Sequence, residues 1–183
     1  MFVSQKLLKL RLKLFFWILS GKIKKVNPEI NLISHLEKVE DIIFIFPMEE
    51  DAFRVSMFSF RNIGNKINNK VNLYYLVNKK FKSIFNIHNG ENIYINDSSF
   101  EKKLSDEKVI LDLLPNIKYG MIIDLNPTFH LGIAKLINLI KSDLKIGFKS
   151  YLSDKFYNIQ FDISKTKVIE SGYIQIKSIL KKL

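Results

Sequence analysis

The 183-residue chain contains no cysteine, which excludes disulfides, zinc–thiolate sites, iron–sulfur clusters and thiol nucleophiles. Histidine is also scarce: His35, His88 and His130 are the only three, and no two of them have the spacing of a metal-ligand pair. We therefore predict no metal site. No Gly-x-Gly-x-x-Gly motif follows the first apolar run, and no Gly-Lys-Ser/Thr phosphate loop occurs, so the sequence predicts no nucleotide cofactor either.

Arginine is rare as well, with Arg11, Arg54 and Arg61 as its three representatives. Lysine nevertheless gives the chain a strong positive charge: 29 Lys and Arg outnumber 18 Asp and Glu, for a net charge of +11. One interpretation is an AT-rich genome, whose codons also favour Asn, Ile and Phe. The other is an anionic partner such as a membrane surface or nucleic acid. Because arginine usually provides bidentate recognition of phosphate and guanine, we do not predict nucleic acid as the partner.

Long apolar runs are missing. The longest, residues 14–19, has six residues, whereas a transmembrane helix needs about 20. Cations inside the apolar part of residues 1–25, and the lack of an Ala-x-Ala-like site after it, argue against a secretory signal. The pattern instead predicts a basic amphipathic helix with Lys6, Lys9 and Lys13 near one face. Such a helix either lies on an anionic membrane surface or packs against its own domain or a partner subunit.

The rest of the chain alternates short β-rich apolar runs with helical patterns. We divide it into a connector with a short helix (26–38), a domain (39–165) and a C-terminal amphipathic helix (166–183). This alternation predicts a single Rossmann-like α/β domain, with a mainly parallel sheet of about five strands flanked by helices. The C-terminal helix either covers this sheet or docks a partner. Predicted strands span 41–46, 70–77, 91–96, 119–125 and 144–148, and the predicted helices between them span 49–63, 78–86, about 105–114 and 128–143.

Acidic residues follow two of the predicted strands. Glu49, Glu50 and Asp51 come directly after strand 41–46, and Asp124 ends strand 119–125. In open parallel sheets, ligands bind beyond the carboxyl ends of the strands, so both acidic groups are expected at one rim. A carboxylate there can act as a general base toward a sugar hydroxyl. For residues 49–51 the alternative is helix capping and compensation of the helix dipole.

Polar residues after Asp124 belong to the same predicted site at the end of strand 119–125. Asn126 precedes a proline, and the structural alternative for Asp124 and Asn126 is a strand-to-helix turn in which Thr128 caps the next helix. His130 follows at the start of that helix. It either contacts a ligand at the same rim or is a partly buried structural histidine.

The second half of the domain resembles a known family. Residues 121–162 contain IIDLN (122–126) at the end of one strand, KIGF (145–148) in the next, and FYNIQ (156–160) after it. This order resembles the acceptor-side half of heptosyltransferase-like glycosyltransferases, and the resemblance extends over about residues 39–165. Members of that family have two Rossmann-like domains at the inner membrane face. The N-terminal domain receives the lipopolysaccharide-core acceptor, and the C-terminal domain holds the ADP-sugar.

The resemblance implies an acceptor-side domain that is cytoplasmic, peripheral to the inner membrane, and active in cell-envelope glycan or lipopolysaccharide assembly. The family's Gly-Asp after the first strand, whose Asp is assigned as the base, is replaced here by PMEED (47–51). By position, Glu50 and Asp51 are therefore the candidate catalytic residues. The candidate substrate-binding residues are Glu49, Asp124, Asn126 and His130.

The 183 residues contain no counterpart of the family's nucleotide-sugar domain, so we expect this polypeptide to be inactive alone. It would then act with a separately encoded donor-domain protein, form a homo-oligomer, or serve as a degenerate half-enzyme for binding. The alternative is a non-catalytic interaction or scaffold module that uses the terminal helices as contact surfaces.

Overall fold

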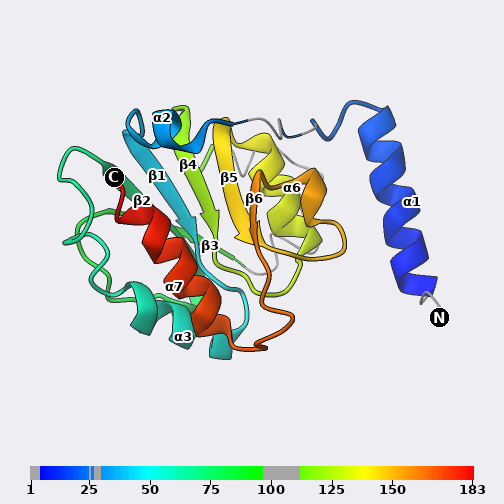
Figure 1. The fold of residues 1–183 in the computed structure, drawn as a ribbon. Helices are drawn as coiled ribbons and strands as arrows, with labels where there is room; N and C mark the ends of the chain where they lie inside the picture. Colours follow the sequence, from blue (N-terminus) through cyan, green and yellow to red (C-terminus); the bar gives the residue numbers. More distant parts are fainter. Residues whose placement is uncertain (1–4, 25, 27–29, 97–111) are drawn as a thin grey trace.

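A computed structural model describes residues 5–24, 26, 30–96 and 112–183, which contain one six-stranded sheet (Figure 1). All five strand pairings are parallel, in the order β3-β2-β1-β4-β5-β6. This order and the flanking helices confirm the Rossmann-like α/β fold. The strands are β1 (Asp41–Ile45), β2 (Asn72–Asn78), β3 (Glu91–Ile95), β4 (Tyr119–Asp124), β5 (Ser142–Phe148) and β6 (Ile159–Phe161).

Helices cover both faces of the sheet. One face packs against α3 and α7, and the other against α6 and part of α1. The C-terminal helix α7 thus covers its own sheet, which is one of the two roles expected for it. The described helices are α1 (Gln5–Leu19), α2 (Leu32–Leu36), α3 (Glu50–Phe60), α6 (Leu131–Leu139) and α7 (Ile169–Leu180), with short 3-10 helices η1 (Lys79–Phe81) and η2 (Ser153–Lys155).

The central strand β1 is buried on both faces. Ile42 and Phe44 belong to the core beneath α3 and α7, whereas Ile43 and Ile45 belong to the core beneath α6. All four side chains are 0% exposed. A strand covered on both faces needs a continuous apolar run rather than an alternating one, which is why residues 41–46 are recognisable in the sequence.

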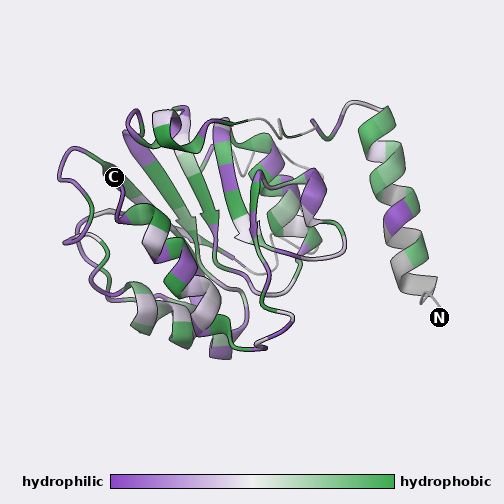
Figure 2. Ribbon diagram, viewed as in Figure 1, coloured by the Kyte–Doolittle hydropathy of each residue, from purple (hydrophilic) through white to green (hydrophobic). Residues whose placement is uncertain are grey.

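Helix α1 lies beside the β6 side of the sheet (Figure 1) and has one packed and one exposed face. Leu14 is 1% exposed, and Trp17 and Ile18 pack partly against the core beneath α6. The Arg11 guanidinium lies 4.1 Å from the centre of the Tyr151 ring. The outer face carries five exposed apolar side chains, those of Leu8, Leu12, Phe15, Phe16 and Leu19, each between 52% and 67% exposed. Figure 2 shows hydrophobic residues along the described part of this helix.

Several predicted elements differ from the observed ones. The helix expected at 78–86 is only the 3-10 turn η1, because Phe81 and Phe85 turn inward to pack on Phe53 and Phe46. The three-residue strand β6 was not predicted. Helix α6 ends at Leu139 because β5 already begins at Ser142, and α7 begins at Ile169 rather than at residue 166. Most of the helix expected at about 105–114 lies outside the described residues.

Candidate functional site

The carboxyl ends of β1 and β4 are adjacent, and the candidate site is built there. Ile45 pairs with Asp124 in the parallel register, and the backbone N–H of Leu125 donates to the Ile45 carbonyl at 2.9 Å. The chain leaves β1 toward β2 on one side and leaves β4 toward β5 on the other. The connections after these strands therefore run in opposite directions, and this switch point is where doubly wound sheets bind ligands. The space beyond the ends of β1 and β4 is called the crevice below.

Asp124 lies at the bottom of this region and is 3% exposed. Its Oδ1 accepts hydrogen bonds from the backbone N–H of Asn126 at 3.0 Å and from Asn126 Nδ2 at 2.6 Å. Its Oδ2 accepts a 2.5 Å hydrogen bond from the hydroxyl of Tyr157. Both carboxyl oxygens are thus engaged within the protein, as a buried carboxyl group requires.

Asn126 extends the network to the loop after β1. Its Oδ1 accepts a 3.0 Å hydrogen bond from the backbone N–H of Met48, and its side chain is 4% exposed. Asp124 therefore holds Asn126, and Asn126 holds the chain just before Glu49. In the described structure these two residues fix the turn and the neighbouring loop, and neither presents its side chain at the surface.

Tyr157 reaches Asp124 from the connection between β5 and β6. A Cβ atom at Gly147 of β5 would lie 2.7 Å from the Tyr157 ring, so glycine leaves the space that the ring occupies. The neighbouring Asn158 is bonded to Lys145 in both directions: its backbone N–H donates to the Lys145 carbonyl at 2.8 Å, and its Oδ1 accepts from the Lys145 N–H at 2.7 Å. Tyr157 was not among the predicted site residues, although FYNIQ contains it.

Burial controls the ionisation of this network. It raises the pKa of Asp124, while the hydrogen bonds from Tyr157 and Asn126 and the nearby His130 act in the opposite direction. Burial, followed by the influence of Asp124, raises the pKa of the Tyr157 hydroxyl well above its usual value. Tyr157 is therefore a neutral hydrogen-bond donor at physiological pH.

Above the buried network lies an exposed cluster of three polar side chains, Glu49, Thr128 and His130. The Thr128 hydroxyl donates to Glu49 Oε1 at 3.1 Å, and His130 Nε2 lies 3.1 Å from the same Thr128 oxygen. His130 Nε2 is 3.7 Å from Glu49 Oε1. The single hydroxyl proton of Thr128 is donated to Glu49. The Thr128 oxygen therefore accepts the second hydrogen bond, from an N–H at Nε2 of His130. The side chains of Glu49 and His130 are 59% and 34% exposed, so the cluster is open to a ligand.

The position of Glu49 agrees with compensation of the α3 dipole but not with side-chain capping. Glu49 occupies the N-cap position of α3, but its side chain makes no capping hydrogen bond and contacts Thr128 instead. In the turn interpretation of Asp124 and Asn126, Thr128 caps the following helix, and that part of the interpretation is wrong. The N-cap of α6 is His130, and the Thr128 hydroxyl instead bonds across the crevice to the loop after β1.

Glu50 and Asp51 lie beside the cluster, in the exposed first turn of α3. Glu50 Oε1 accepts hydrogen bonds from Nε and a terminal nitrogen of Arg54, at 3.0 and 2.7 Å. A first-turn position is also where the helix dipole favours negative charge. Of the six predicted site residues, the structure thus brings Glu49 and His130 together, buries Asp124 and Asn126 beneath them, and leaves Glu50 and Asp51 to one side. The catalytic assignment to Glu50 and Asp51 stays a prediction.

Within the described ranges, no group of three or more His, Asp or Glu side chains is arranged to hold a metal ion. No helix in those ranges is long and apolar enough to cross a membrane. The fold and the crevice define the chain as a Rossmann-like α/β domain with a polar cluster at its switch point. Comparison with protein-family models, curated proteins and solved structures gave no match.

Proposed function

We propose that this chain is the acceptor-side domain of a heptosyltransferase-like glycosyltransferase, and that it binds a hydroxyl-rich glycan in the crevice between β1 and β4. The proposal rests on the resemblance of residues 121–162 and on one structural observation in particular. That observation is the open Glu49–Thr128–His130 cluster at the place where doubly wound sheets bind ligands.

The cluster has the chemistry that a sugar hydroxyl needs. A glutamate oxygen can accept a hydrogen bond from the sugar. The Thr128 hydroxyl and the His130 N–H, which here donate within the cluster, can turn to donate to sugar oxygens instead. Among the three acids Glu49 is the proposed base, because it lies in the cluster with Thr128 and His130, whereas Glu50 pairs with Arg54 to one side. In transfer, Glu49 would take the acceptor hydroxyl proton as that oxygen attacks the anomeric carbon and the nucleoside diphosphate departs.

The nucleotide-sugar would be held by a donor domain of the kind that the family has, and we propose that the Glu49 cluster acts together with such a domain. Lipopolysaccharide or another cell-envelope glycan is the proposed acceptor. We further propose that the protein acts at the cytoplasmic face of the inner membrane. The exposed apolar face of α1, together with the net charge of +11, supports attachment to an anionic surface.

Binding calorimetry with a deacylated lipopolysaccharide-core oligosaccharide tests the glycan site. We expect Glu49→Gln to weaken binding by about tenfold, because it removes a charge-assisted hydrogen bond worth ~1.5 kcal/mol or more. Glu170→Gln is the matched control, since Glu170 is also an exposed acid at the start of a helix. Equal affinities for the wild type, Glu49→Gln and Glu170→Gln, or no binding to any of them, would refute the glycan site.

The second candidate is a non-catalytic interaction module. It is favoured by the burial of Asp124 and Asn126, whose hydrogen bonds are used to hold the loop at Met48 rather than to receive a ligand. In this case the outer face of α1 would be the contact surface. Flotation on anionic vesicles, with and without residues 1–25 and at low and high salt, separates a lipid contact from a protein contact.

A further inference from the structure

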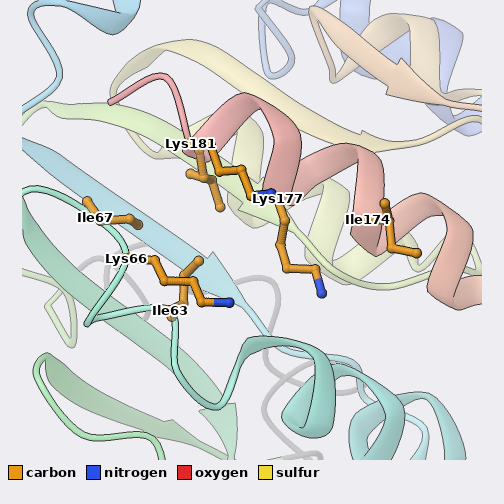
Figure 3. A pocket seen from close by; sticks show the side chains of 7 residues that line it. Ile63, Lys66, Ile67, Ile174, Lys177 and Lys181 are labelled. Carbon is orange, nitrogen blue, oxygen red and sulfur yellow. The ribbon is translucent and has the colours of Figure 1, made fainter.

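A second concave site lies far from the Glu49 cluster, between α7 and the connection that joins α3 to β2 (Figure 3). It has a volume of about 250 Å³. The connection leads to the amino end of β2, whereas the Glu49 cluster lies at the carboxyl ends of β1 and β4. The two sites are therefore separate, and nothing in the proposed glycan chemistry uses the second one.

The floor of this pocket is apolar and buried. Ile63, Ile67 and Leu180 form it, with exposed fractions of 3%, 5% and 2%. Ile174 stands at the rim and is 62% exposed, so the apolar surface continues from the floor toward solvent. A ligand with an apolar part would remove this surface from water, which the hydrophobic effect favours.

The rest of the lining is cationic. Lys66 comes from the connection, Lys177 from α7, and Lys181 directly follows α7 as its C-cap. Figure 3 shows Lys66 and Lys177 reaching into the space between the two segments. Among the described residues, no carboxylate forms an ion pair with any of the three ammonium groups. The Lys177 ammonium has one long hydrogen bond, 3.4 Å to the Ser59 carbonyl.

The three charges oppose one another. Partial burial, followed by the charges of Lys66 and Lys181, lowers the pKa of Lys177 below its usual value. A bound anion would relieve this repulsion and would also compensate for the partial burial. Lysine ammonium groups act as compact point charges toward phosphate, and three of them suit a dianionic phosphate monoester.

We propose that this pocket binds a small phosphate monoester with an apolar portion, the phosphate between Lys66, Lys177 and Lys181 and the apolar part over Ile63, Ile67 and Ile174. The volume of about 250 Å³ is slightly smaller than the ~300–1,000 Å³ of common ligand pockets, so it suits a small molecule. A lipid within a flat bilayer fits less well. The pocket lies on the α3/α7 face of the sheet, whereas α1 packs on the α6 face.

Two-dimensional ¹H–¹⁵N NMR titration of the full chain with hexyl phosphate tests the proposal. We expect saturable shifts at amides 63–67 and 174–181, and binding about tenfold weaker in Lys177→Gln. Lys70→Gln and Lys182→Gln are matched controls, because these exposed lysines lie on the same two segments but do not line the pocket. Both controls should bind like the wild type. Weakening by the controls equal to that in Lys177→Gln, or an absence of saturable shifts, would overturn the site.

Two further binding measurements identify the class of ligand. Ile174→Ser should weaken hexyl phosphate about threefold and leave inorganic phosphate unchanged, because it removes only apolar surface. If inorganic phosphate binds the wild type as tightly as hexyl phosphate, the apolar part of the proposal is wrong. If phosphatidic acid vesicles bind in a Lys177-dependent way while hexyl phosphate does not, the site belongs to a membrane lipid and the small-molecule proposal fails.

Discussion

The hydroxyl of Tyr157 donates a 2.5 Å hydrogen bond to Asp124 Oδ2 across 33 residues of sequence, joining the β5–β6 connection to the end of β4. Asp124 in turn holds Asn126, and Asn126 holds the backbone of Met48. Three loops at one edge of the sheet are thus fixed by one buried chain of hydrogen bonds. This network supports the exposed cluster of Glu49, Thr128 and His130 from below.

Removing the Tyr157 hydroxyl should destabilise the protein. We expect Tyr157→Phe to lower the free energy of unfolding by ~1–3 kcal/mol, because it leaves a buried carboxyl oxygen without its donor. Tyr75→Phe is the matched control: Tyr75 is equally buried, but its hydroxyl has no partner in the described structure. The control should be neutral or slightly stabilising in urea denaturation. If the two variants lose the same stability, the network is not what holds these loops.

Gly147 should be intolerant of a side chain. We expect Gly147→Ala to cost ~1–3 kcal/mol, because its Cβ would lie 2.7 Å from the Tyr157 ring in a packed core. The cost should fall substantially when the same change is made in a Tyr157→Ala background, since the ring is then absent. A double-mutant cycle measures this difference. Equal costs in both backgrounds would show that the ring is not the obstacle.

The Asp124 carboxyl should titrate above the range of an unfolded chain. Its pKa is raised by burial, so the folded-state value lies above the unfolded value of about 3.9. The stability that Asp124 contributes is then fully present below pH ~4 and is lost as the pH rises through the folded-state pKa. Carboxyl ¹³C NMR should show this raised midpoint, and a still higher one in Tyr157→Phe. A midpoint at or below 3.9 would contradict the account.

Lys145 should give the opposite sign of pH dependence. Burial lowers its pKa to about 8, and its ammonium donates to the Ile137 carbonyl at 2.6 Å near the end of α6. Since the folded-state pKa lies below the usual 10.5, its contribution to stability is present above pH 10.5 and is lost as the pH falls through 8. The stability difference between wild type and Lys145→Met should therefore shift in favour of wild type from pH 7 to 10. A constant difference would argue that Lys145 is not perturbed.

The sequence predicted the sheet well because each main strand is a short run of β-branched and aromatic residues, buried on both faces in β1. It did not predict β6, whose three residues are too short to show a period. The sequence correctly placed Asp124 and Asn126 at the carboxyl end of a strand, which is β4. Their burial was not predictable, because it depends on Tyr157, which only the fold brings next to Asp124. The role of Thr128 was missed for the same reason, since Glu49 lies 79 positions away.

The main proposal is that a glycan binds in the crevice between β1 and β4, at the Glu49 cluster. The most direct measurement is an ¹H–¹⁵N NMR map of the full chain titrated with a deacylated lipopolysaccharide-core oligosaccharide. We expect saturable shifts concentrated at amides 48–51, 126 and 128–131, and their loss in Glu49→Gln. Shifts confined to other surfaces, or shifts that persist unchanged in that variant, would contradict it.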